Sequence, residues 1–460
     1  MKGSNYDVLF LRPQDIADVV DMSEAIDLVE QGYREAQDFS LINAPRRRVH
    51  SRKNVRISNF PGGVDGVSTT TKDSREPARS LAMLIIDNEL VSQLLTMEDC
   101  IRVQEEAFKK LPIGASIHRP RIDMYFPCDR QDGYFRWGAM EGANDGYFAI
   151  RMKSDVITWP KDASGNWTEE KYCREPGTYC GLVFLLSTRN GEPLAFINDG
   201  VLQHMRVGGG AGIGAKYLAR EDSRVVGMLG SGGMARTFLE AFKCVRDVCL
   251  CKVYSPTPAR REAFAEEMSR RLNIEVRAVD DPREAVRGAD ILSSCTDSMR
   301  PVYDADWIEK GMHVTNLGRR EMPDAVMTRF DVVVRQGTAG LQMKQSERFQ
   351  AERGLSPAAF IGGTVEEMKR IPAPNTQPGF GGDSPEFADR GRGGDKPDFA
   401  DLASGKCKGR TGRDQITFYR NVGNQGLQFS AVGGWVYEQA VKQRRGREIP
   451  TEWFLQNIRD

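Results

Sequence analysis

The sequence lacks several features that mark common classes of protein. No apolar run approaches the ~18 residues of a membrane-spanning helix, and residues 1–12 lack the apolar core of a signal peptide. The net charge is zero, with 64 basic and 64 acidic residues, so no charge excess indicates nucleic acid or an anionic membrane as a partner. We therefore expect a soluble, cytoplasmic protein, and its 460 residues are enough for two or three domains.

Disulfide and metal-binding patterns are also missing. The nine cysteines are odd in number and contain no C-x-x-C pair, which is typical of reduced thiols. The four histidines lie far apart in the sequence, without the spacing of metal ligands. We predict neither a disulfide framework nor a metal site.

A glycine-rich turn is the most informative motif in the chain. Residues 224–229 read as a buried strand, and Gly230, Gly232 and Ala235 follow with the spacing G-x-G-x-x-A before a helix expected over residues 234–246. The first glycine permits a tight turn, the second removes a Cβ that would block a pyrophosphate, and the alanine lets the helix approach its strand. The predicted phosphate-binding residues are Gly230, Ser231, Gly232, Gly233, Met234 and Ala235.

The segments after this turn alternate between strand and helix patterns. Strands are expected at residues 251–254, 274–279, 290–294, 313–318 and 331–334, with helices at 259–272 and 283–287. Such alternation is typical of a doubly wound parallel sheet, which binds ligands at the carboxyl ends of its strands. Further cofactor candidates at these ends are Thr296, Asp297, Ser298, Leu317, Gly318 and, after a later strand, Asn421.

The end of the second strand predicts which dinucleotide binds. An acidic residue there would bind the ribose 2′-hydroxyl of NAD, but no Asp or Glu occurs before Glu262. Ser255, Thr257 and Arg260 could instead surround a 2′-phosphate. We therefore favour NADP(H), with NAD(H) possible if the basic residues only face solvent.

Three segments leave alternatives open. Residues 1–80 resemble the segment after them, since Pro45-Arg46 and Lys72 match Pro120-Arg121 and Lys153 at shifts of 75 and 81, so they are either a duplicated unit or a chance match. The aromatic residues 159–179 form either a pocket wall or a surface insertion. Residues 345–400 are rich in Gly, Pro, Asp and Arg and read as an insertion.

Taken together, the motifs resemble the ornithine cyclodeaminase/mu-crystallin family. The residues that carry the resemblance are Pro120-Arg121, Met152-Lys153, the helix around Arg206, the glycine turn, Cys295 to Pro301 and Ile416 to Gly423. The resemblance implies a Rossmann domain at residues 216–344, inserted in an α+β substrate and dimerisation domain formed by residues 81–215 and 401–460. It also implies a homodimer.

The resemblance carries specific roles onto three basic residues. The family's substrate-carboxylate arginine corresponds to Arg121, its active-site lysine to Lys153 and its second pocket arginine to Arg206. All three would bind the substrate, and Lys153 and Arg206 would also be catalytic. The chemistry agrees, because guanidinium groups bind carboxylates through two parallel hydrogen bonds and a desolvated lysine can exchange a proton.

One departure from the family pattern bears on the reaction. True cyclodeaminases carry an Asp shortly after the glycine that corresponds to Gly318, but here Arg319-Arg320-Glu321 follows at once. The chain is therefore more similar to imine reductases and amino-acid dehydrogenases of the family. We expect an NAD(P)(H)-dependent oxidoreductase of a carbon–nitrogen bond in a carboxylate-bearing amino or imino acid. The alternatives are an ammonia lyase that recycles NAD and a non-catalytic NADPH-binding protein.

Overall fold

A computed structural model describes most of the chain after residue 81. Side chains are described for residues 82–161, 165, 168–298, 300–318, 321–337, 359–371 and 396–458. For the strands β1 (Arg48–His50), β2 (Arg56–Ser58) and β17 (Phe349–Arg353), and for residues 356–358, only the backbone is described. Arg46 and Lys72, and with them the proposed N-terminal duplication, lie outside the described residues.

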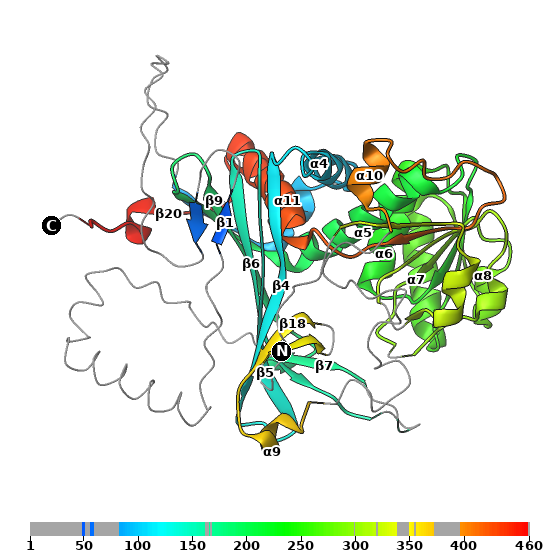
Figure 1. Cartoon of the computed structure of the whole chain (residues 1–460), viewed down its shortest axis with the longest axis horizontal. Coiled ribbons are helices and arrows are strands. Elements are labelled where there is room, and N and C mark those ends of the chain that lie inside the picture. Colours follow the sequence, from blue (N-terminus) through cyan, green and yellow to red (C-terminus); the bar gives the residue numbers. More distant parts are fainter. Residues whose placement is uncertain are drawn as a thin grey trace, which may run out of the picture.

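Two large sheets, which lie side by side (Figure 1), make up most of the described fold, and β1 and β2 form a separate two-stranded sheet. The larger sheet has eleven strands, and its central members β4, β5 and β6 are twelve residues each. Along the sheet the order is β17, β18 (Ser356–Ile361), β4 (Ser116–Pro127), β5 (Gly133–Asn144), β6 (Tyr147–Thr158), β9 (Cys180–Ser187), β10 (Pro193–Asn198), β3 (Met83–Ile86) and β20 (Arg447–Ile449), with β7 (Glu170–Cys173) and β8 (Glu175–Pro176) attached to β6.

The second sheet has seven strands, all parallel. Its order is β13 (Glu275–Ala278), β12 (Leu250–Tyr254), β11 (Val225–Leu229), β14 (Ile291–Ser294), β15 (His313–Asn316), β19 (Thr417–Arg420) and β16 (Val332–Arg335). The helices α6 (Gly233–Val245), α7 (Pro258–Leu272) and α8 (Pro282–Val286) connect its first strands. This parallel sheet with its helical connections confirms the predicted α/β fold class.

The C-terminal segment contributes to both sheets. β19 pairs with β15 on one side and β16 on the other, whereas β20 extends the eleven-stranded sheet beside β3. Residues 345–400, expected as an insertion, also contribute structure. β17 and β18 form a hairpin, and Ala359–Ile361 of β18 pair in parallel with Asp123–Tyr125 of β4. The short helices α9 (Val365–Met368) and α10 (Phe399–Ala403) follow.

Two helices, α3 (Asn88–Leu94) and α4 (Met97–Lys109), follow β3 in the sequence. Thr96 is in extended conformation, and its hydroxyl accepts a hydrogen bond from the backbone N–H of Asp99. This N-cap starts a new helix in the middle of the apolar pattern.

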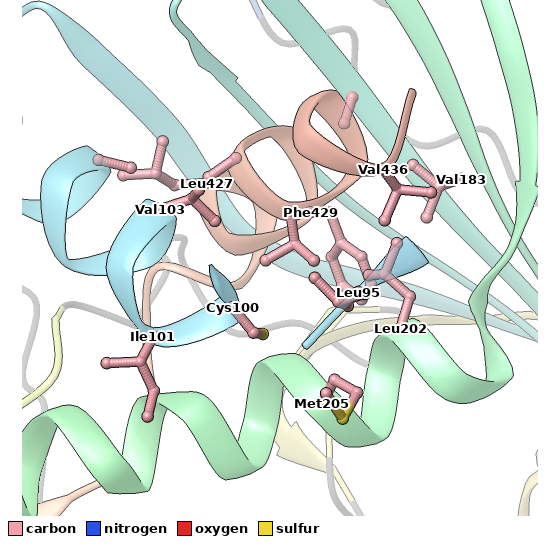
Figure 2. Close-up of a cluster of buried hydrophobic side chains, with 14 of the residues drawn as sticks. Leu95, Cys100, Ile101, Val103, Val183, Leu202, Met205, Leu427, Phe429 and Val436 are labelled. Atoms are coloured by element: carbon pink, nitrogen blue, oxygen red, sulfur yellow. The ribbon is translucent and has the colours of Figure 1, made fainter. Parts of the chain in front are cut away.

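The helices α4, α5 (Asp199–Leu218) and α11 (Gln425–Gln443) enclose the main hydrophobic core (Figure 2). Phe429 of α11 lies between side chains of α5 and α3–α4, and it is fully buried. The opposite face of α5 packs on α6, through Val207, Ala211 and Ala215 against Phe238 and Phe242. Thus α5 connects the two sheets. No helix within the described ranges is long and apolar enough to cross a bilayer.

Candidate active site

The glycine turn after β11 has the geometry of a dinucleotide site. Gly230 has φ +104°, and a Cβ on it would lie 2.2 Å from the carbonyl oxygen of Cys295, so only glycine fits. At Gly232, by contrast, a Cβ would meet nothing within 4 Å. No side chain caps the start of α6, so its first N–H groups remain available to an anion. These residues fit the pyrophosphate of a nicotinamide dinucleotide.

The loops after β14 and β15 are joined by a buried glutamate. Glu321 is fully buried, and its two carboxylate oxygens accept hydrogen bonds from the backbone N–H groups of Thr296 and of Gly318 (2.5 Å). Burial nevertheless raises the pKa of Glu321 to about 7. The predicted cofactor residues of these loops, Thr296 to Ser298 with Leu317 and Gly318, are therefore held at the edge of the parallel sheet that also carries the turn.

The predicted phosphate-selecting residues lie at the end of β12. The residue Ser255 is buried, whereas Thr257 and Arg260 face solvent at the start of α7. The side chain of Arg260 makes no hydrogen bond or ion pair with any part of the chain that the structure describes; its backbone N–H donates to the carbonyl oxygen of Thr257 (3.1 Å). Its neighbour Arg261 is buried, donates to the carbonyl oxygen of Ser255 (2.9 Å) and pairs with Asp280, so its role is structural.

Charged residues cover one face of the eleven-stranded sheet. One row of neighbouring residues crosses four strands of this sheet: Asp123 of β4, Gly138 of β5, Lys153 of β6 and Gly181 of β9. A Cβ atom on Gly138 would lie 2.2 Å from the carboxylate of Asp123, and one on Gly181 would lie 1.9 Å from the carboxylate of Asp199. The glycines thus make room for two carboxylates over the sheet.

Three arginine–aspartate pairs neutralise most of this charge. Each pair is buried or nearly so. The Nε atom of each arginine donates a hydrogen bond to its aspartate, and the Nη2 atoms of Arg121 and Arg136 donate a second one. The pairs are Arg121–Asp123, Arg136–Asp155 and Arg151–Asp199. Arg121, predicted to bind a substrate carboxylate, therefore already holds an aspartate with two of its nitrogens.

Lys153 shares the carboxylate of one of these pairs. Its Nζ lies 2.8 Å from Oδ2 of Asp155 and 5.1 Å from the centre of the Tyr179 ring. Burial, together with the positive charge of Arg136, lowers the pKa of Lys153 to about 7. Its amine can therefore gain or lose a proton near neutral pH.

Arg206 on α5 is a buried cation held by amides. Its guanidinium donates to Oε1 of Gln203 (2.8 and 3.2 Å) and to Oε1 of Gln428 (2.9 Å), and it lies over the Phe429 ring. Among the described residues it forms no ion pair. Burial lowers the pKa of Arg206 to about 9, with a further contribution from the charge of Arg151. A buried charge without a counter-ion is costly, so this position favours an anionic ligand.

The structure brings the three predicted cations near one another. Arg121 lowers the pKa of both Lys153 and Arg206, and Tyr179 adjoins both. The helix that carries Arg206 also reaches the glycine turn, because the ring of His204, two residues earlier on α5, lies 3.1 Å from the position that a Cβ on Gly233 would occupy. The side-chain amide of Asn421 donates to the carbonyl oxygen of Val207 (2.9 Å), the residue that follows Arg206 on α5.

The amino-acid sequence matches a known family. The sequence model of the ornithine cyclodeaminase/mu-crystallin family matches residues 82–444, most of the chain. The chain belongs to this family. The resemblance in its motifs is thereby confirmed.

Several members of the ornithine cyclodeaminase/mu-crystallin family are similar over long stretches. The Delta(1)-pyrroline-2-carboxylate reductase of Bacillus cereus is 27% identical over 373 residues, which cover 80% of this chain and 99% of the relative. The alanine dehydrogenase of Archaeoglobus fulgidus is 29% identical over 258 residues, 55% of this chain and 73% of the relative. These relatives confirm the prediction of an enzyme of the nicotinamide-dependent oxidoreductase type that acts on carbon–nitrogen bonds.

Solved structures of the family have the same fold. The Thermococcus litoralis Delta(1)-pyrroline-2-carboxylate reductase, in complex with NADH and L-proline, aligns with a TM-score of 0.58 at 24% identity, covering 80% of this chain and all of that one. An archaeal alanine dehydrogenase dimer with bound NAD aligns with a TM-score of 0.58 at 23% identity, covering 80% of this chain and 99% of that one.

Sequence reasoning missed the acidic and aromatic partners of the three cations. Arg151, Lys153 and Asp155 alternate along one strand, a period-two pattern that places three charges on one face. That pattern could have indicated a buried polar cluster. Tyr179 lies in the aromatic segment 159–179, of which residues 162–164 and 166–167 are outside the described set, and its ring contacts Lys153 as a pocket wall would. Nothing in the sequence indicated Arg136 or Gln428.

Among the described residues, no group of three or more His, Cys, Asp or Glu side chains could hold a metal ion.

Proposed function

We propose that this protein reduces an imino acid, or oxidises the corresponding amino acid, at the carbon next to its carboxylate, with NADP(H) as the preferred cofactor. The observation that carries the proposal is the pair of buried cations Lys153 and Arg206, because Arg206 forms no ion pair with a described residue and Lys153 shares the carboxylate of Asp155 with Arg136. Its family relatives that act on carbon–nitrogen bonds support the same chemistry.

Arg206 would bind the substrate carboxylate. Its burial and its lack of an ion pair with any described residue make a carboxylate the ligand that compensates its charge best. The amide groups of Gln203 and Gln428 fix the orientation of the guanidinium before the substrate arrives. The remaining Nη1 of Arg121 could add a second contact, because Asp123 engages only its Nε and Nη2.

Lys153 would exchange the proton of the substrate nitrogen. A nicotinamide bound at the edge of the parallel sheet supplies or accepts the two electrons and one proton at carbon. In the reductive direction the Lys153 ammonium gives its proton to nitrogen and later regains one from solvent. An amine that titrates near neutral pH suits this exchange.

NADP(H) preference rests on Ser255, Thr257 and Arg260. The exposed Arg260 at the start of α7, with no acidic residue at the end of β12, suits a 2′-phosphate. A homodimer is also proposed, because an archaeal relative of the same fold is a dimer.

A substrate screen tests the proposal. Purified protein would be mixed with NADPH or NADH and a panel of cyclic and linear imino acids, and the reduced-nicotinamide absorbance followed. We expect oxidation of the nicotinamide with at least one imino acid. Release of ammonia from an amino acid without added nicotinamide would favour the lyase alternative. Tight binding of NADPH without any turnover would favour a non-catalytic role.

A further inference from the structure

Beneath Lys153 lies the most deeply buried arginine among the described residues. Arg136 of β5 is 1% exposed and Asp155 of β6 is 2% exposed, and the two residues are direct cross-strand neighbours. The Nε and Nη2 atoms of Arg136 donate to Oδ1 (2.9 Å) and Oδ2 (2.7 Å) of Asp155. This is the parallel two-bond geometry that guanidinium and carboxylate groups prefer.

The same carboxylate also accepts the Lys153 ammonium. Oδ2 of Asp155 lies 2.8 Å from Nζ of Lys153 and is the oxygen that Arg136 Nη2 contacts. The Asp155 carboxylate thus contacts two cations, and the Glu169 carboxylate acts on Arg136 as a further nearby negative charge.

This two-to-one ratio has a chemical consequence. If Asp155 faced Lys153 alone, a buried ion pair would hold the lysine in its charged form. Because Arg136 already neutralises the carboxylate of Asp155, the positive charge on protonated Lys153 is not needed to balance that carboxylate. Removal of that proton leaves a neutral amine above an intact arginine–aspartate pair. Arg136 and its two hydrogen bonds keep Asp155 ionised, with a pKa of about 2 despite its burial.

We propose that Arg136 and Asp155 are positioning residues that make Lys153 a reversible proton donor. Arg136 occupies the carboxylate that would otherwise lock the lysine as an ammonium, and Asp155 holds the amine in place over the sheet. This inference rests on the proposed function only for what receives the proton, namely the substrate nitrogen. The charge balance itself does not depend on the substrate.

The other charged groups that face Lys153 come from three neighbouring elements. Arg121 of β4 and Lys171 of β7 both disfavour its charged form, and the ring of Tyr179, just before β9, lies over it. None of these groups contacts Asp155 in the described structure. Arg136 is therefore the group that decides how much of the Asp155 charge reaches the lysine.

The decisive experiment measures the protonation of Lys153 without any substrate. The full-length protein is labelled briefly with an amine-reactive ester across a range of pH, and the labelled fraction of the Lys153 peptide is measured by mass spectrometry. The wild-type midpoint is expected near pH 7. Arg136→Met should raise the midpoint by about one pH unit or more, which is about a tenfold gain in proton affinity.

Two further variants keep the test decisive if Arg136→Met folds poorly. Asp155→Asn should shift the midpoint the opposite way, to lower pH, because it leaves two cations without a carboxylate. Arg136→Lys retains the charge and should stay closer to wild type than Arg136→Met. Arg130→Met removes an exposed arginine that pairs with Asp132 and should leave the midpoint unchanged. Circular dichroism and thermal melting establish which variants are folded.

The proposal is overturned if a folded Arg136→Met or Asp155→Asn variant has the wild-type midpoint, or if both shift it in the same direction. If the midpoints move as expected but no imino acid is turned over, the positioning role stands and the proposed reaction fails. If turnover occurs and the midpoints do not move, the reaction stands and the positioning role fails.

Discussion

The substitution Gly232→Ala should separate cofactor binding from folding. Gly232 has φ −81°, which alanine adopts readily, and its Cβ would meet no protein atom within 4 Å. The loss of stability should be a few tenths to about 1 kcal/mol, from the poorer helix cap. The new methyl group would occupy the space through which a pyrophosphate approaches the start of α6. Overpacking of that kind costs about 1–3 kcal/mol, which is roughly a 5- to 150-fold loss of affinity.

The assay is a fluorescence titration of the variant with NADPH and NADH, together with thermal melting. Gly230→Ala is the matched control, because its positive φ and the overlap with the Cys295 carbonyl oxygen should destabilise the fold itself by about 1–3 kcal/mol or more. If Gly232→Ala bound the dinucleotide as tightly as wild type, the glycine turn would not be the pyrophosphate site. A large fall in its melting temperature would contradict the open space at Gly232.

Three other predictions address the rest of the site. Arg206→Met should lower kcat/KM for a carboxylate substrate by roughly 10- to 100-fold, because a hydrogen-bonded ion pair with the substrate is lost. NADPH binding should be unchanged. A loss of NADPH affinity would instead place Arg206 in the cofactor site. Arg260→Ala should reduce the preference for NADPH over NADH about tenfold in binding titrations, and an unchanged ratio would refute the phosphate site. The pKa of Glu321 is about 7 in the folded state and about 4.5 in the unfolded state, so the folded state binds more protons between these two pH values. The free energy of unfolding should therefore fall as pH rises through this window, by up to about 3 kcal/mol. Urea unfolding at both ends of this window should show that dependence in wild type and not in Glu321→Gln; equal slopes would contradict it.

Local patterns were sufficient to predict much of the fold. The helix predicted at residues 234–246 is α6 (Gly233–Val245), and the predicted strands over 251–254 and 290–294 correspond to β12 and β14. Each depends on a short periodic pattern bounded by turn residues.

The partners across the sheets could not be predicted in the same way. Arg136 contacts Asp155 only because β5 and β6 align in one register, and Gln428 reaches Arg206 from a helix more than two hundred positions away. Such contacts depend on tertiary arrangement, which no short sequence window contains. The cations themselves were identified by their motifs, but the counter-charges that determine their chemistry required the structure.

The most direct test of the account compares imino acids with matched imines that lack the carboxylate, by following the reduced-nicotinamide absorbance in wild type and Arg206→Met. Wild type should prefer the carboxylate-bearing compounds by roughly 10- to 100-fold, and the variant should lose most of that preference. Equal rates for both classes of imine in wild type would contradict the assignment of the buried cations to a substrate carboxylate.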